Sequence, residues 1–496
     1  MMMRESGSSF EQNPLSTKLP LPSDSVVSNI NGGQIDDDKI QNSSDEEIIL
    51  SKREILCFRV SFLNVLLMGV GFMLNLGALN TAWMAQAVVL YSVNDEYFEA
   101  STTFGYTLWA ISSGVACVAV LVAPSIVALV GPKVTLITGG ICTTLYVAAF
   151  IRPLKSTMYM AAVFVTLGST LMWQVQGHFI TVNSTNKRVS RNTGIFLALY
   201  QSSLVLSNLF YFFMLNGDEV ISPAKRIQIF SILTAAATIG VIVLTLLVHP
   251  WLEKIPRPPA EVSVDKQEAV QAQPSHRTPG EAFYAMLQAM RRKDIMILIP
   301  VFFYLGIEGS FWSIYATALG YTERFGSLQQ ALVGLTSVFA GAGEIIAGTL
   351  VGLLGKWMHY NGKDGILVIG MLVHIVMAYM TFLNTPMIAS TTVTSDKAFV
   401  GPNAYIAMLI SFMLGLGDGI FNGQIIGYLG SAYRHDCVSV FAVCNFWAAI
   451  GSTVAFLYAA LLLPYQLLIL ILVAIAGTTG FCIVEWKNFR KPLPLA

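Results

Sequence analysis

Long apolar runs alternate with short polar segments along most of the chain, six before residue 249 and six after residue 294. The first six lie near residues 56–80, 104–130, 133–151, 157–180, 194–215 and 227–248. The second six lie near residues 295–319, 328–355, 365–384, 403–429, 438–462 and 464–485. Because a helix needs about 20 apolar residues to cross the hydrocarbon core of a bilayer, each run predicts a transmembrane helix.

A polar segment over residues 249–294 divides the two sets of runs. It contains the Pro-Arg-Pro-Pro sequence at 256–259, ends in the basic cluster Arg291, Arg292 and Lys293, and holds no run of spanning length. Two six-helix halves joined by a long basic connection are typical of transporter-like membrane proteins built from repeats.

The pattern predicts five regions. In chain order they are a disordered cytoplasmic tail at 1–52, an N-terminal six-helix half at 53–249, a cytoplasmic linker at 250–293, a C-terminal six-helix half at 294–486 and a cytoplasmic C-terminal tail at 487–496. The first tail is rich in Ser, Asn, Asp and Gly and lacks the charged-then-apolar arrangement of a signal peptide.

A short internal repeat links the two halves. Residues 123–131 end the second run and residues 347–355 end the eighth, and these nine-residue segments are identical at four positions. A lysine, Lys133 or Lys356, follows each segment closely. Repeats at corresponding places are expected of the major facilitator fold. We therefore predict an all-α integral membrane protein with twelve transmembrane helices in two six-helix halves.

Composition excludes most other classes of protein. Hydrophobic residues make up 54% of the chain and charged residues 12%, which is about half the charge content of a soluble protein. The formal net charge is zero, so the chain lacks the basic field that a nucleic-acid partner requires. The lipid bilayer is the partner that this composition predicts.

Motifs for chemistry are also missing from the sequence. The six cysteines and six histidines are scattered without metal-ligand spacing, and no cysteine falls in a predicted outside loop. No phosphate-cradling loop or serine elbow occurs. We predict no metal, no cofactor and no enzymatic activity.

Positive charges predict the orientation. With the N-terminus inside, the cytoplasmic segments from residue 52 onward hold twenty Lys and Arg, thirteen of them outside the linker, and the outside loops hold six. Both termini are therefore predicted to be cytoplasmic. Residues 45–50, Asp-Glu-Glu-Ile-Ile-Leu, loosely resemble an acidic dileucine sorting signal, although short matches of this kind are common by chance. The expected location is the plasma membrane or an endolysosomal membrane.

Three carboxylates fall inside predicted spans of the second half: Glu308, Glu344 and Asp418. Each costs about 2.5 to 3.5 kcal/mol at a helix centre on insertion scales, so such residues often mark substrate or ion pathways. No Lys or Arg falls in the middle of any span. Protonation, hydrogen bonds to amides or a water-filled cavity would resolve this cost.

The first half carries amides instead of acids. The candidate residues for binding a substrate or an ion are Glu308, Glu344, Asp418, Asn422, Gln424, Gln174, Gln176, Asn75, Gln201 and Asn208. A half lined with acids facing a half lined with amides would suit a small cationic or polar solute, or proton coupling. The alternative is that these groups hydrogen-bond between helices and hold them together.

Glycines repeat every four residues in the tenth run, and a shorter series occurs in the eighth. The candidate helix-packing residues are Gly415, Gly419, Gly423, Gly427, Gly348 and Gly352. A stripe without side chains lets a neighbouring helix approach closely. Asp418 and Asn422 share the adjacent face of the tenth run.

Several strings, in order and at consistent spacing, resemble those of the Unc-93-like family of the major facilitator superfamily. They are Leu171–Gly177, Thr181–Ser184, Arg191–Phe196, Gln201–Ser203, Gly306–Phe311, Gly341–Glu344, and Leu414–Asp418 with Phe421, Asn422 and Gln424. The similarity runs from about residue 58 to Trp486 and is greatest to the orphan major facilitator domain-containing branch of that family.

This resemblance implies twelve spans around a central cavity, and it implies two kinds of function. The founding member of the family is regarded as a regulatory partner of a potassium channel, another member escorts nucleic-acid-sensing receptors, and the branch most similar to this chain is described as transporters. Two positions depart from the family. Asn445 stands where relatives carry a lysine, and Asn422-Gly423-Gln424 stands where they carry Asn-Thr-Gln.

Two hypotheses follow. The first is a transmembrane transporter that moves a small polar or cationic solute, whose identity is unknown, by alternating access between its two halves. The alternative is a non-transporting regulatory or trafficking subunit of an ion channel, such as a potassium channel, or of a membrane receptor.

Overall fold

The computed structural model describes residues 37–93, 103–183, 189–218, 220–248, 279–354, 362–433 and 436–489. The chain divides into two units, Met1–Leu56 and Cys57–Ala496. Apart from residues 53–56, both predicted six-helix halves lie in the second unit, so their packing can be described directly.

The N-terminal half contains a helix at each of its six predicted runs. They are α1 (Asp37–Tyr91), α2 (Phe104–Val130), α3 (Pro132–Ala149), α4 (Lys155–Val182), α5 (Val189–Leu215) and α6 (Pro223–Thr245). Helix α1 begins inside the segment predicted as a tail and continues past the predicted boundary at residue 80. The extension carries Gln86, whose side chain is buried and donates to the carbonyl oxygen of Gly105 at 2.7 Å.

The C-terminal half also contains a helix at each predicted run, together with two short elements. In order they are α8 (Pro279–Met290), α9 (Lys293–Gly320), the 3-10 helix η2 (Glu323–Leu328), α10 (Gln329–Leu353), α12 (Asp364–Asn384), α13 (Ala404–Ala432), α14 (Cys437–Tyr458) and α15 (Leu463–Phe489). Helix α8 lies in the predicted linker, where the sequence pattern predicted no helix.

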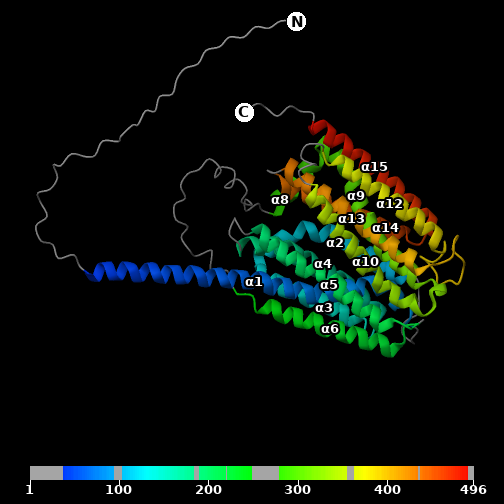
Figure 1. The fold of residues 1–496 in the computed structure, drawn as a ribbon, viewed down its shortest axis with the longest axis horizontal. Coiled ribbons are helices and arrows are strands. Elements are labelled where there is room, and N and C mark those ends of the chain that lie inside the picture. Colours follow the sequence, from blue (N-terminus) through cyan, green and yellow to red (C-terminus); the bar gives the residue numbers. More distant parts are fainter. Residues whose placement is uncertain are drawn as a thin grey trace, which may run out of the picture. The chain divides into compact units, whose positions relative to one another are not determined.

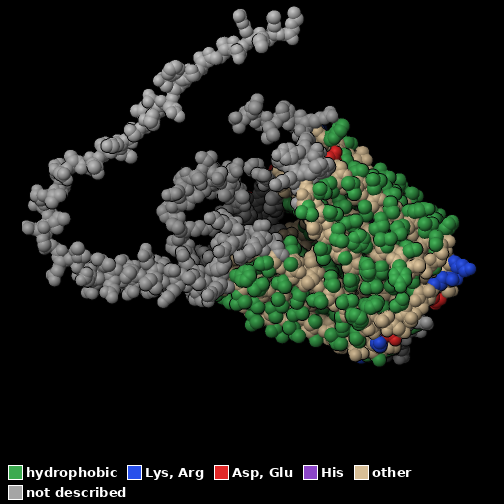
Figure 2. All heavy atoms as spheres, viewed as in Figure 1, with side chains coloured by type: hydrophobic (Ala, Val, Ile, Leu, Met, Phe, Trp, Pro, Cys, Tyr) green, Lys and Arg blue, Asp and Glu red, His purple; other side chains and the backbone are tan. Residues whose placement is uncertain are grey.

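Eleven helices in the described part of the chain are long and apolar enough to cross a membrane. The remaining predicted span is α3, a helix of 18 residues that packs against α4 and α6. Figure 2 shows hydrophobic side chains over most of the visible face of the bundle, with most of the visible charged side chains at its right and lower right edges. This distribution is expected of a surface that faces lipid.

The two halves meet along two pairs of helices, α2 with α14 and α5 with α10. Helices α1 to α6 run from blue to green in Figure 1 and lie to one side of the yellow, orange and red helices of the second half. Both hydrophobic cores cross this boundary, because Tyr321 and Val333 belong to the first core and Ala87 and Trp109 to the second.

Hydrogen bonds join the halves at one end of the bundle, called here the closed end. The Tyr321 hydroxyl donates to the carbonyl oxygen of Ala87 at 3.1 Å, and the Tyr106 hydroxyl donates to that of Ser390 at 2.6 Å. A further bond runs from the Gly217 N–H to the Ser327 carbonyl oxygen at 3.0 Å. The opposite end, where α6 stops and α8 begins, is called the linker end.

Candidate functional site

The three predicted acids come together from three helices. Glu308 lies on α9, Glu344 on α10 and Asp418 on α13, and the Asp418 carboxyl is within hydrogen-bonding reach of both glutamates. We call this group the acid cluster. Three carboxyl groups this close cannot all be ionised at low cost, and a proton held between two of them gives the hydrogen bond that two carboxylates lack.

Glycines allow this convergence. A Cβ atom on Gly415 would lie 1.9 Å from the carbonyl oxygen of Ala340, and one on Gly343 would lie 2.2 Å from that of Phe412. Helices α10 and α13 therefore touch backbone to backbone, as small residues permit within a membrane. That contact holds Glu344 beside Asp418.

Glu308 is fully buried and has no hydrogen-bond donor on either carboxylate oxygen among the residues that the structure describes. The nearest base is His374, whose Nε2 lies 3.5 Å from Glu308 Oε2. The same Nε2 is 3.2 Å from the Leu414 carbonyl oxygen, and Nδ1 contacts the Tyr304 hydroxyl. A neutral imidazole satisfies both of these contacts, so His374 supplies no positive charge to Glu308, and a proton shared with Asp418 is the hydrogen bond left to it.

The other two acids have amide neighbours. Asn422 Nδ2 donates to Asp418 Oδ1 at 2.8 Å, within α13. Gln201 Nε2 lies 3.5 Å from Glu344 Oε2, and this contact joins α5 of the first half to α10 of the second. The acid cluster is therefore connected to the boundary between the halves.

A pocket of about 390 Å³ lies mainly within the first half. Its lining residues are Leu76, Leu79, Asn80, Trp83, Val120, Ser169, Thr170, Trp173, Gln174, Tyr200 and Asn445. Lys and Arg are absent from this lining. Tyr200 connects the two sites, since it lines the pocket and precedes Gln201, which contacts Glu344.

Aromatic rings form much of the pocket wall. The Trp173 and Tyr200 rings meet edge to face with centroids 4.9 Å apart. The Tyr200 hydroxyl accepts from Asn80 Nδ2 at 3.4 Å. The pocket lies on the linker side of a contact between Ser113 of α2 and Ser452 of α14, whose hydroxyl oxygens are 3.0 Å apart. The closed end therefore separates it from the far side of the bundle.

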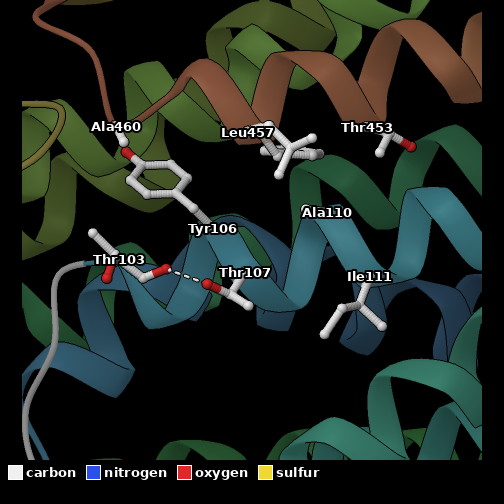
Figure 3. A pocket seen from close by; sticks show the side chains of 9 residues that line it. Thr103, Tyr106, Thr107, Ala110, Ile111, Thr453, Leu457 and Ala460 are labelled. Atoms are coloured by element: carbon white, nitrogen blue, oxygen red, sulfur yellow. Dashed lines mark hydrogen bonds between the residues drawn. The ribbon is translucent and has the colours of Figure 1, made fainter.

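A second pocket, of about 340 Å³, lies at the closed end between α2 and α14 (Figure 3). Thr103, Thr107 and Thr453 supply hydroxyl groups, and the Thr107 hydroxyl donates to the Thr103 carbonyl oxygen at 3.1 Å. No acidic or basic residue belongs to its lining.

The predicted amides divide between the pocket and the helix contacts. Gln174 is exposed in the pocket, and Gln176 is half-buried on the same helix. Asn75 lies elsewhere, among α1, α3 and α6, where Nδ2 contacts the carbonyl oxygens of Gly140 at 3.0 Å and Ala237 at 3.2 Å.

Two further amides are buried away from the pocket lining. Asn208 Nδ2 donates to the Leu204 carbonyl oxygen at 2.8 Å within α5, and its Oδ1 has no partner in the part of the chain described. Gln424 is 1% exposed on α13, and its Nε2 is likewise unpaired there.

The predicted packing glycines have different surroundings. A Cβ on Gly419 would lie 2.7 Å from Ala347 Cβ, whereas Gly423 would meet Val351 at 3.8 Å and Gly427 would meet Lys363 Nζ at 3.5 Å. Gly348 has open space around it, and the surroundings of Gly352 lie outside the described side chains. Gly343, which the sequence analysis did not single out, makes the close contact on α10.

Sequence reasoning missed the aromatic wall and the partners of His374. Asn445 appeared only as a departure from related sequences, yet it is the one pocket-lining residue from α14. Trp83, Trp173 and Tyr200 lie inside apolar runs, where an aromatic residue gives no sign of whether it faces lipid, core or cavity.

Solved structures show which fold this arrangement of helices has. A POT family transporter in complex with 5-aminolevulinic acid matches with a TM-score of 0.59 at 12% identity, covering 85% of this chain and 96% of that one. The nucleoside transporter NupG matches with a TM-score of 0.57 at 12% identity, covering 85% and 99%. The protein therefore has the fold of major facilitator transporters.

Its family follows from sequence. Residues 99–483 match the family described as Ion channel regulatory protein UNC-93. The chain is 34% identical over 437 residues to the UNC93-like protein MFSD11 of Xenopus laevis, covering 87% of this chain and 97% of that protein. It is 22% identical to protein unc-93 homolog A of Bos taurus, covering 86% and 94%. The chain belongs to the UNC-93 family.

Proposed function

We propose that this protein carries a small organic cation across the membrane by alternating access. The observation that supports this most directly is the link from the aromatic pocket to the acid cluster, in which Tyr200 lines the pocket and the adjacent Gln201 contacts Glu344. Aromatic faces attract a cation, most strongly when water is excluded, and carboxylates supply the opposite charge. The pocket lining contains no Lys or Arg to repel such a solute.

The contacts between the halves support the carrier mechanism. Hydrogen bonds join the halves at the closed end, and the pocket lies on the linker side of that seal. Carriers of this fold expose a central site alternately by rocking one half against the other. With the linker end in the cytoplasm, as the positive charges predict, the pocket would face inward in this state.

A ligand screen on purified protein tests the proposal without knowledge of the natural substrate. Small ammonium compounds should raise the thermal unfolding temperature of the wild type, and neutral isosteres of the same size should not. Glu344→Gln should abolish this shift, because it removes the carboxyl group that Gln201 contacts. Glu323→Gln is the matched control, since that acid is exposed at the closed end.

Compounds that pass this screen are then measured for uptake into proteoliposomes. Equal stabilisation by cations and neutral isosteres, or an undiminished shift in Glu344→Gln, would argue against a cation site.

A regulatory role is the second candidate, and the family description favours it because it names ion channel regulation. The test is to isolate the tagged protein gently from its native membrane and to weigh the intact complex. A stoichiometric channel or receptor subunit would support the regulatory role. A lone protomer or a homo-oligomer would support the carrier.

A further inference from the structure

Helix α8 has two different faces. Met286 and Ala289 are almost fully buried and belong to the hydrophobic core of the second half. Phe283 and Tyr284 are 44% and 66% exposed. Helical spacing places Leu287 and Arg291 on the same side as Tyr284, at i+3 and i+7. An aromatic and apolar stripe ending in a cation is therefore directed away from the bundle.

The position of α8 fixes what this stripe faces. The helix ends at Met290, and the spanning helix α9 begins at Lys293. A helix joined to a span by so short a connection must lie close to the plane at which that span leaves the bilayer. Tyrosine and other amphipathic rings favour the headgroup level, and amphipathic helices with basic residues bind there.

Basic side chains surround the end of α8. Arg291 and Lys293 are exposed, whereas Arg292 is held by an ion pair with Asp436. Lys487 of α15 reaches the same region, with Nζ 3.0 Å from Asp294 Oδ1. We propose that α8 and the basic residues after it form a binding surface for anionic phospholipids at the linker end.

Two contacts give such binding a consequence for the fold. Helix α8 packs against α14 of its own half and also against α2 of the other half. Lipid headgroups that hold α8 at the surface would therefore stabilise the boundary between the halves near the linker end. The proposal does not depend on the identity or existence of a transported solute.

Hydrogen–deuterium exchange in nanodiscs tests this surface on the full chain. One set of discs contains phosphatidylcholine alone, and the other contains phosphatidylcholine with phosphatidylserine. Phosphatidylserine should slow amide exchange across residues 280–290 several-fold in the wild type. Raised salt should reverse the effect, because the attraction is electrostatic.

Two variants and a control identify the residues responsible. Replacing Arg291 and Lys293 together by Gln should remove most of the protection, since each cation near an anionic surface contributes about fivefold to binding. Tyr284→Ser should weaken protection in both kinds of disc. Lys397→Gln removes an exposed cation at the closed end and should change nothing. Thermal unfolding of each variant verifies that it is folded.

Three outcomes would overturn the proposal. One is identical exchange of α8 with and without phosphatidylserine in the wild type. Another is a phosphatidylserine effect that persists in the folded double variant. The third is equal protection by soluble glycerophosphoserine added to phosphatidylcholine discs, which would indicate a site for a free anion instead of a lipid surface.

Discussion

Asn75 in the first half and Glu308 in the second are both polar, both fully buried and both within spanning helices. Their surroundings differ. The Asn75 side chain contacts the Gly140 and Ala237 carbonyl oxygens and the hydroxyl groups of Thr143 and Thr144. Glu308 has no donor on either oxygen in the described part of the chain.

This difference separates two uses of polarity inside a membrane. A satisfied side chain such as Asn75 links helices and contributes to stability. An uncompensated acid is costly, so its presence is better explained by a ligand or a proton than by packing. The sequence displays both as polar residues in apolar runs, and only the contacts distinguish them.

The largest effect is expected at the glycine contact that holds the acid cluster together. Gly415→Ala should lower the free energy of unfolding by about 3 kcal/mol, because its Cβ would overlap the Ala340 backbone and separate α10 from α13. Gly348→Ala is the control: it has open space and should be neutral or stabilising by up to about 1 kcal/mol. Unfolding in mixed detergent measures both, and equal losses would refute a special contact at Gly415.

Removing the satisfied amide should have the next largest effect. Asn75→Ala should cost about 2 kcal/mol of unfolding free energy, since several interhelical bonds of modest strength are lost. Cation-induced stabilisation should remain, because Asn75 lies outside the pocket. If the folded variant instead loses the cation-induced stabilisation, Asn75 would be part of the functional site, and the distinction drawn between Asn75 and Glu308 would be wrong.

Replacing the buried acid should change stability little while changing function. Glu308→Gln keeps the size of the side chain and removes a buried carboxyl group, so the free energy of unfolding should shift by less than about 1 kcal/mol in either direction. Solute uptake should be abolished. If the unfolding free energy instead falls as far as in Asn75→Ala, Glu308 would be a packing residue like its counterpart.

A residue on the exposed side of the pocket completes the series. Gln174→Ala should leave unfolding within about 0.5 kcal/mol, as is usual for exposed positions. Its expected effect is a few-fold decrease in cation affinity, measured by titration of the thermal shift. A complete loss of binding would instead make Gln174 a principal ligand.

The helices were predictable because the bilayer demands length and apolarity together. Each of the twelve runs contains a helix. Helix α8 was not predicted, because its 12 residues are too few to span a membrane and it follows a long polar segment. The end of α1 was misplaced because Asn80 and Gln86 interrupt the apolar run, although Gln86 is satisfied by Gly105.

The candidate site was less predictable. Carboxylates in spans stand out in any sequence, and the structure brings Glu308, Glu344 and Asp418 together. Amides do not stand out in the same way, since a buried amide finds partners on whichever helix is near. The glycine repeat indicated close approach, but period alone could not show that Gly343, and not Gly348, faces the partner helix.

The hydrogen bonds of two tyrosine hydroxyl groups at the closed end favour the arrangement of the two halves seen in this structure. Tyr106 and Tyr321 each reach a backbone carbonyl oxygen of the opposite half. If each bond stabilises this arrangement by about 1 kcal/mol, the pair favours it roughly thirtyfold over one in which the closed end parts. Both acceptors are backbone carbonyl oxygens. Replacing the side chain of Ala87 or Ser390 would therefore leave the two hydrogen bonds in place as long as the backbone is preserved. Substitutions that remove the hydroxyl group of Tyr106 or Tyr321 would therefore shift the equilibrium between the two arrangements.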